Sequence, residues 1–171
     1  MENKVNERSN HKVLVVYYSK TGHTQKIAQD IAKQMDADLE EIIDQKKRTG
    51  VLGFISGGRD AMTNKETLIS GMRKNSADYE LVILGSPIWA GNIAPAVRTY
   101  INRYRDSLPS VAFFFSSGGK TPDQVFEKLS GVVKEKPVAM TGLSHSEIKD
   151  DNIYKIKISL FIDSLRRVEG S

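Results

Sequence analysis

Runs of apolar residues alternate with amphipathic segments along most of the chain. The first run, Val13 to Tyr18, is continuous and consists of β-branched and aromatic residues, which is typical of a strand buried on both faces of a parallel sheet. The same pattern predicts four further strands, at Leu39 to Ile43, Leu81 to Gly85, Val111 to Phe115 and Pro137 to Met140.

The segments between these strands carry apolar residues at helical spacing. One helix is expected from Thr24 to about Met35, a second from near Ala94, and a shorter one after Pro122. The last helix is expected to begin near Asp151. Its inward face is expected to comprise Ile153, Ile156, Leu160, Phe161, Leu165 and Val168.

Strands that alternate with helices imply right-handed crossovers, and therefore a parallel sheet with helices on both faces. The sequence thus predicts an α/β fold of three layers, with a doubly wound, five-stranded parallel sheet. A length of 171 residues indicates one domain, expected at residues 12–171 after a polar tail at residues 1–11. About thirty residues, from Gln45 to Ser76, separate the second and third strands; we expect one helix and a packed excursion there.

Composition excludes several kinds of site. The chain has no cysteine, which removes disulfides, thiol nucleophiles, iron–sulfur ligation by thiolates and the usual structural zinc sites. The three histidines, His11, His23 and His145, are too scattered to suggest a metal site with local spacing. We therefore expect no metal site, and any redox chemistry needs a bound cofactor.

The charge pattern bears on partners and location. The net charge is +4, but 25 basic residues are interleaved with 21 acidic ones, so a solvated basic face is favoured over a nucleic-acid or membrane partner. The balance is more basic from Gln45 to Lys74. No uncharged run approaches the ~20 residues of a membrane helix, and the first residues lack the apolar core of a signal peptide. A cytoplasmic location is therefore expected; the sequence does not set the oligomeric state.

The loop after the first strand is the candidate ligand site, because open parallel sheets bind ligands at the carboxyl ends of their strands. It reads Ser19-Lys20-Thr21-Gly22-His23-Thr24, with three hydroxyl groups and one glycine, and it leads into a helix whose free N–H groups attract an anion. A phosphate suits this chemistry, although the same residue types also serve simply as helix caps. A dinucleotide fingerprint needs three glycines and only Gly22 is present, so a mononucleotide is indicated.

This loop resembles the phosphate loop of the flavodoxin family, Ser/Thr-x-Thr-Gly-x-Thr, at every specified position. The resemblance covers most of the chain and is to the short-chain type, since Val138 to Leu143 shows no insertion. It implies FMN as the cofactor and the strand order 2-1-3-4-5, with FMN between strands one and three as is known for flavodoxin itself. It also implies that the phosphate is held by Ser19, Lys20, Thr21, Gly22, His23 and Thr24.

Two further loops are expected to contact the flavin ring. The third strand leads into a loop with the only tryptophan of the chain, and its candidate residues are Pro87, Ile88, Trp89, Ala90, Gly91 and Asn92. By itself Trp89 would be interpreted as a core residue at a strand end, and its place beside the loop after the first strand favours the flavin. The fourth strand supplies Ser116, Ser117, Gly118, Gly119 and Lys120. If Lys120 faces the ring, its charge stabilises anionic reduced flavin and raises the two-electron potential. His145 is a candidate for the rim.

The resemblance implies an FMN-binding redox protein that transfers electrons through the flavin to a redox partner protein. Such carriers are usually strongly acidic, and this chain is not. The alternative is an FMN-dependent reductase that takes hydride from NADH or NADPH to a quinone or another small-molecule acceptor, with Lys46, Lys47, Arg48 or Arg59 near its entrance. A third reading is a non-catalytic binding module. No catalytic side chain is expected, because the chemistry would be the flavin's.

Overall fold

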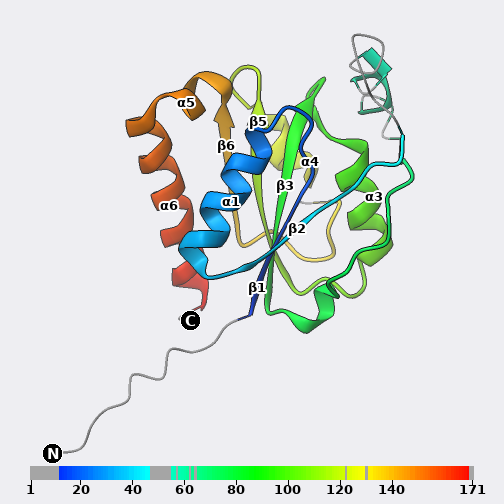
Figure 1. Ribbon diagram of the computed structural model, residues 1–171. Helices are drawn as coiled ribbons and strands as arrows, with labels where there is room; N and C mark the ends of the chain where they lie inside the picture. Colours follow the sequence, from blue (N-terminus) through cyan, green and yellow to red (C-terminus); the bar gives the residue numbers. More distant parts are fainter. Residues whose placement is uncertain are drawn as a thin grey trace, which may run out of the picture.

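A parallel β-sheet lies at the centre of the protein (Figure 1). The computed structural model describes residues 12–46, 55–56, 58–61, 63, 65–121, 123–129 and 131–169. Within these residues the sheet has the order β2-β1-β3-β5-β6, and β4 pairs with the end of β3 in the antiparallel sense. The strands are β1 (Val13–Tyr17), β2 (Asp38–Glu41), β3 (Leu81–Trp89), β4 (Asn92–Ile93), β5 (Ser110–Ser117) and β6 (Ala139–Ser144).

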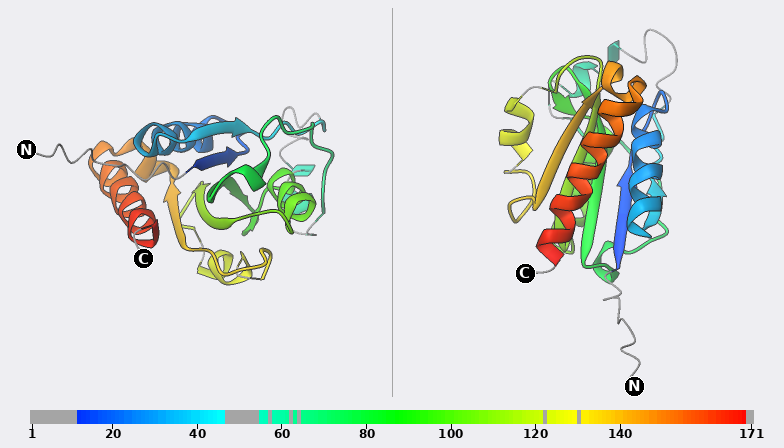
Figure 2. Two further views of the ribbon diagram at one scale, coloured as in Figure 1. Left: turned by 90° about the horizontal axis from the view of Figure 1, so that it is seen from below. Right: turned by 90° about the vertical axis from the view of Figure 1, so that its left-hand side faces the viewer.

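Helices cover both faces of this sheet, as the two further views show (Figure 2). One face is covered by α1 (His23–Met35) and α6 (Asp151–Glu169), and the other by α3 (Pro95–Tyr104) and α4 (Asp123–Leu129). A short helix, α5 (His145–Lys149), and a 3-10 turn, η1 (Ser76–Asp78), complete the described elements. The predicted three-layer, doubly wound fold is confirmed, and so is the order 2-1-3-4-5 of its five parallel strands.

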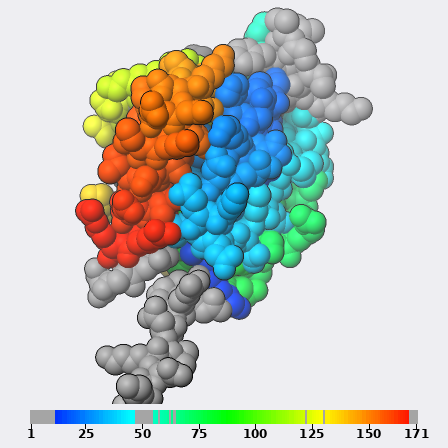
Figure 3. All heavy atoms as spheres, turned by 60° about the vertical axis from the view of Figure 1, so that its left-hand side comes forward, coloured from blue at the N-terminus to red at the C-terminus, as the bar shows by residue number. Residues whose placement is uncertain are grey.

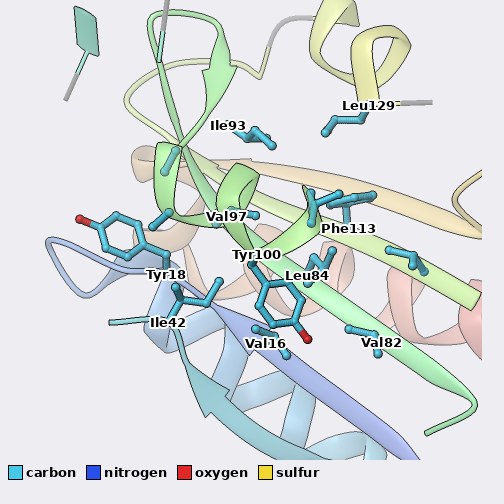
Figure 4. Close-up of a cluster of buried hydrophobic side chains, with 14 of the residues drawn as sticks. Val16, Tyr18, Ile42, Val82, Leu84, Ile93, Val97, Tyr100, Phe113 and Leu129 are labelled. Carbon is cyan, nitrogen blue, oxygen red and sulfur yellow. The ribbon is translucent and has the colours of Figure 1, made fainter. Parts of the chain in front are cut away.

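Alternation along the central strands explains why both faces must be covered. In β1, Val13, Val15 and Tyr17 pack against α1 and α6, whereas Leu14 and Val16 pack toward α3. Successive side chains of a strand point to opposite faces, so a strand without polar residues is apolar on both. Figure 4 shows the α3 and α4 side of this core, where side chains from the sheet meet those from the two helices.

Gly85 allows β3 to lie close to β5. It is opposite Phe114 in the register of the two strands, and a Cβ atom on Gly85 would lie 2.1 Å from Phe114 Cζ. The fully buried Phe114 ring therefore occupies the space that any side chain would need. The sequence predicted that β3 ends at Gly85, and this boundary was wrong: the glycine is there for close approach, and the strand continues to Trp89.

The predicted end of the fifth parallel strand was also wrong. It was expected at Pro137 to Met140, but β6 begins at Ala139 and continues to Ser144. The small and polar residues after Met140 are not typical strand formers, yet they pair in register with β5 as far as Ser117. Tertiary pairing with a buried neighbour thus outweighs local propensity.

The inward face of α6 agrees with the predicted one at Phe161 and Leu165, and the side chain of Val168 lies outside the described part. It differs at Ile153, Ile156 and Leu160, which are exposed, Ile156 to 60%. The residues that pack against the sheet and α1 are Tyr154, Ile158, Phe161, Ile162 and Leu165. Apolar residues occur around more than one side of this helix, so periodicity alone does not fix its rotation. Two polar contacts favour the observed face: the Tyr154 hydroxyl donates to Asp30 of α1 at 2.6 Å, and the ammonium of Lys26 lies 4.0 Å from the Tyr154 ring centroid.

The excursion between β2 and β3 is only partly described. Residues 55–56 and 58–61 are helical, in line with the helix expected there, and Ala61 is buried while Ile55 is exposed. Other residues on which the expectation of a packed excursion rested lie outside the described part, namely Val51, Leu52, Phe54 and Met62. The same is true of Lys47, Arg48 and the predicted tail at residues 1–11.

A buried carboxylate fixes the return of the chain from this excursion. Both oxygens of Glu40 in β2 accept hydrogen bonds from backbone N–H groups, from Arg73 at 2.6 Å and from Lys74 at 3.0 Å. Glu40 is 4% exposed. A charged acceptor with two backbone donors makes strong hydrogen bonds, so this contact positions the chain before it enters β3.

Replacing Gly85 by alanine is expected to destabilise the protein, because the new methyl group would overlap the Phe114 ring. Overpacking of this kind costs about 1–3 kcal/mol. Urea unfolding followed by circular dichroism would measure the change, with Gly71→Ala as the control, since a Cβ at Gly71 meets nothing within 4 Å. Equal stabilities for Gly85→Ala and the wild type would contradict the role assigned to this glycine.

Candidate functional site

The carboxyl ends of the parallel strands meet at one edge of the sheet, which is the upper edge in Figure 1. Four connections converge there: the loop after β1, the β3–β4 hairpin, the loop after β5 and the junction of β6 with α5. All three loops in which the sequence placed candidate site residues therefore lie at the same edge. This is where an open parallel sheet binds ligands.

The loop after β1 presents the start of α1 to this edge. Gly22 is the N-cap residue, with φ of +88°, a left-handed conformation that favours glycine. Its N–H donates to Ser19 Oγ at 3.2 Å, which holds the loop in a tight turn. Because glycine has no side chain to cap the first turn, and a Cβ there would meet nothing within 4 Å, the start of α1 is approachable. These features fit a phosphate group.

Thr24 joins the loop after β1 to the end of β5. Its side chain is 1% exposed, and its Oγ1 lies 2.8 Å from Ser116 Oγ. The Thr24 hydroxyl therefore has a partner in the sheet, and its expected contact with a phosphate stays a prediction. Of the other two hydroxyl groups in the loop, that of Thr21 lies on an exposed residue and that of Ser19 on a half-buried one. The hydroxyl pair thus fixes the distance between two of the candidate loops.

The β3–β4 hairpin has a strained two-residue turn. Ala90 and Gly91 have φ of +48° and +73°, the signs that a type I′ turn requires at both central positions. A left-handed alanine is uncommon, and such strain is concentrated at functional sites. The buried Ser86 holds the base of the hairpin: its Oγ accepts from Ala94 N–H at 3.0 Å and donates to Pro87 O at 2.9 Å.

Trp89 connects this hairpin to the loop after β1. It is half-buried and packs on the core, and its ring meets Tyr18 edge to face with centroids 5.7 Å apart. The ammonium of Lys20 lies 5.9 Å from the Trp89 ring centroid, within range of a cation–π contact. Trp89 therefore has features of both interpretations of the sequence, as a core residue and as a site residue. It packs on the core, and it remains partly exposed at the candidate site.

The loop after β5 divides into a buried half and an exposed half. Ser116 and Ser117 belong to β5 and are buried, while Gly118, Gly119 and Lys120 are exposed. Ser117 Oγ donates to the carbonyl of Gly119 and lies 3.3 Å from Thr121 Oγ1, so it stabilises the turn from below. The exposed half supplies backbone groups and the Lys120 charge to the edge of the site.

The junction of β6 and α5 brings a histidine to the loop after β1. The rings of His145 and His23 stack with centroids 3.9 Å apart and planes inclined by 8°. His23 Nδ1 lies 2.9 Å from Thr21 Oγ1. Burial lowers the pKa of His145, and the charges of His23 and Lys149 lower it further. The space-filling view shows α5 and the start of α1 in contact on one face of the molecule (Figure 3).

The described residues contain no group of three or more histidine, aspartate or glutamate side chains placed to bind a metal ion. None of the helices in the described part of the chain is long and apolar enough to cross a bilayer.

Comparisons with known proteins agree with this architecture. The fold is similar to that of a flavoprotein from Lactobacillus acidophilus NCFM in complex with FMN, with a TM-score of 0.68 and 23% identity over 82% of this chain and 97% of that one. It is also similar to the apo-form of the flavoprotein from that organism, with a TM-score of 0.58 and 24% identity over 77% and 91%. A flavodoxin from the domain Archaea gives a TM-score of 0.55 at 19% identity over 92% and 99%. These likenesses establish the shared fold.

The fold and the loops together define a doubly wound α/β protein whose polar loops gather at the carboxyl edge of its sheet. The family model described as flavodoxin matches residues 12–156, which is most of the chain. The chain therefore belongs to the flavodoxin family, and the resemblance seen in its sequence is confirmed.

Three residues that the sequence placed weakly or not at all belong to this region. Tyr18 reads as the end of a buried strand, but it contacts Trp89. Ser86 reads as the start of a loop, but it is buried and holds the hairpin. His145 was only a candidate for the rim, and nothing in its local sequence indicates the stacking on His23. Such contacts arise between residues distant along the chain. For His145, the only signal in the sequence was its position at the carboxyl end of a predicted strand.

The Thr24–Ser116 contact can be measured with a double-mutant cycle. Thr24→Val and Ser116→Ala each leave one buried hydroxyl without its partner and are expected to cost about 1–3 kcal/mol. The double variant should cost less than the sum, with a coupling of about 1 kcal/mol. Urea unfolding gives these values, with Thr21→Val at an exposed position of the same loop as the control. Additive costs would show that the two hydroxyls do not act as a pair.

Proposed function

We propose that this protein binds FMN at the carboxyl edge of its sheet and transfers electrons through the bound flavin. The observation that carries the proposal is the convergence of the loop after β1, the β3–β4 hairpin and the loop after β5 at one edge, in a chain of the flavodoxin family. Support also comes from the flavoprotein of Lactobacillus acidophilus, which shares the fold and whose structure is a complex with FMN.

The residues divide into groups with different tasks. The first turn of α1, with Gly22 and the hydroxyls of Ser19 and Thr21, would hold the phosphate, because unpaired N–H groups and the positive end of the helix dipole attract an anion. Lys20 adds a positive charge beside this loop. The hydroxyl of Thr24 would act indirectly, by keeping the start of α1 against β5.

The ring would lie between the hairpin and the loop after β5. The residues of this proposed ring site are Pro87, Ile88, Trp89, Ala90, Gly91, Asn92, Ser116, Ser117, Gly118, Gly119 and Lys120. Trp89 offers an apolar wall, and the exposed backbone of Gly118 and Gly119 offers hydrogen-bonding groups to a polar edge. Bound FMN supplies one- and two-electron redox chemistry; the protein supplies position and electrostatics.

The fluorescence of Trp89 can report FMN binding directly, because it is the only tryptophan. Adding FMN to the apoprotein is expected to quench it with a stoichiometry of one. Riboflavin, which lacks the phosphate, is expected to bind at least about tenfold more weakly, since charge-assisted hydrogen bonds are lost. Ser19→Ala should weaken FMN binding about fivefold and leave riboflavin binding unchanged.

Ser107→Ala is the matched control for Ser19→Ala, because Ser107 is an exposed serine just before β5, at the opposite edge of the sheet. It should bind FMN like the wild type. A colourless protein that FMN neither quenches nor colours would refute the proposal.

A specific cavity favours the second candidate function, an FMN-dependent reductase of a small-molecule acceptor. A cavity of about 270 Å³ adjoins the hairpin. Its lining combines apolar and basic side chains with two hairpin residues, and comprises Gly91, Asn92, Ile93, Arg98, Val125, Lys128, Leu129 and Val132. Among the described residues, Arg98 Nε is a buried donor without a hydrogen-bond partner, and an anion beside this guanidinium would supply one. These features fit a small acceptor with an apolar body and one negative group, reduced at the expense of NADH or NADPH.

The two candidate functions are separated by anaerobic addition of NADPH to the FMN-loaded protein. A reductase bleaches the flavin spectrum without a partner protein, and a carrier does not. If bleaching occurs, 1,2-naphthoquinone-4-sulfonate is expected to have a KM about five- to tenfold below that of neutral 1,2-naphthoquinone, because Arg98 pairs with the sulfonate. Arg98→Gln should abolish this preference and Arg103→Gln, at an exposed position of α3, should keep it. An unchanged preference in Arg98→Gln would exclude the cavity as the acceptor site.

A further inference from the structure

His23 and His145 are the two described histidines, and they stack on each other. His23 is the first residue of α1 and His145 is the first residue of α5, so the pair connects the loop proposed to hold the phosphate with the end of β6. Their ring centroids are 3.9 Å apart. His23 continues the chain of contacts through Nδ1, which lies 2.9 Å from Thr21 Oγ1.

The stacking of the two rings makes double protonation of the pair unfavourable. Two positive imidazolium rings stacked at this distance repel each other strongly. Burial, His23 and Lys149 together lower the pKa of His145. Glu147, the acid on the same helix, is already engaged, because its carboxylate accepts from Ser144 N–H at 2.8 Å and pairs with Lys157 of α6 at 2.7 Å.

Two lysines of the neighbouring elements contact other groups. Lys26 of α1 pairs with Asp30 at 2.9 Å and lies over the Tyr154 ring, and Lys20 lies beside Trp89. Lys149, on the same helix as His145, is the neighbouring lysine whose charge acts on that histidine.

Protonation of His23 changes what the Thr21 hydroxyl can do. In the neutral Nε2–H tautomer, Nδ1 of His23 accepts the hydroxyl proton of Thr21, and that proton is not available to a ligand. In the protonated ring, Nδ1 carries hydrogen and must donate to Thr21 Oγ1. The Thr21 hydroxyl is then free to donate to a phosphate oxygen.

We propose that His145 and His23 form a proton-binding pair that takes up one proton when FMN binds and makes the site selective for the phosphorylated flavin over riboflavin. This inference rests on the proposed function, since it requires the phosphate to lie at the loop after β1. The phosphate dianion draws the proton onto the pair, and the protonated pair turns Thr21 into a donor toward the phosphate. His145 acts through His23 and is therefore a positioning residue.

The sign of the pH dependence follows from this linkage. A group that gains a proton on binding makes binding stronger as pH falls. The affinity for FMN should increase as the pH falls from 8 to about 6. Below about pH 6 it should increase no further, because the phosphate itself takes up a proton. Riboflavin has no phosphate, so its affinity should not change over the same range.

The test is the ratio of the riboflavin Kd to the FMN Kd, measured by Trp89 fluorescence at pH 8, 7 and 6. In the wild type this ratio is expected to rise about five- to tenfold from pH 8 to pH 6, as a neutral hydrogen bond is replaced by a charge-assisted one. In His145→Gln it should change less than about twofold. His11→Gln, which removes the third histidine, is the matched control and should behave like the wild type.

Two further measurements separate a proton-linked role from a structural one. Titration of the imidazole NMR signals should show that FMN, but not riboflavin, raises the pH at which the pair titrates. Thr21→Val should lose most of the pH dependence, because its side chain cannot donate to the phosphate; this variant also decides the matter if His145→Gln does not fold.

The same rise of the ratio in His145→Gln and in the wild type would overturn the inference, with the proposed function left standing. If the protein binds neither FMN nor riboflavin at any pH, the proposed function fails and the inference fails with it.

Discussion

A parallel sheet that is buried on both faces leaves only its edges for polar chemistry. In this protein the central strands β1, β3 and β5 contribute apolar side chains to two separate clusters, one under α1 and α6 and the other under α3 and α4. Polar residues are therefore gathered where these strands end, and Thr24, Ser86, Ser116 and Ser117 are buried there. Burial obliges their hydroxyls to find partners, and the partners they find lie on adjoining segments of the same edge.

The sequence predicted the strands well where the apolar pattern of a single segment is sufficient to identify it. Continuous runs of β-branched and aromatic residues such as Val13 to Tyr18 are typical of doubly covered strands, and the order of the parallel strands followed from the family resemblance. The predictions failed where tertiary contacts decide. The hairpin strand β4 is only Asn92 and Ile93 and carries no periodic signal. The rotation of α6 depends on Tyr154 and Asp30, which are 124 residues apart. The burial of Thr24 depends in the same way on Ser116, which no local pattern shows.

The candidate site combines buried, hydrogen-bonded residues with residues that are exposed. Thr24, Ser86 and Ser116 are buried and hydrogen-bonded, so they set the spacing of the loops before any ligand arrives. Thr21, Gly22, Gly118, Gly119 and Lys120 are exposed. Binding that orders only a few exposed residues costs less conformational entropy than binding that must also bring the loops together.

The strained β3–β4 turn is likewise an exposed feature that buried residues hold in position. Ala90 holds a left-handed conformation that costs free energy, and the surrounding contacts must over-determine it. Those contacts are present: Ser86 closes the base of the hairpin, and Trp89 packs against Tyr18 and the core. The turn is therefore held open at the edge of the sheet by buried groups behind it. A ring that packed against Trp89 would meet a surface already shaped by these contacts. Formation of the turn would therefore not reduce the free energy of binding.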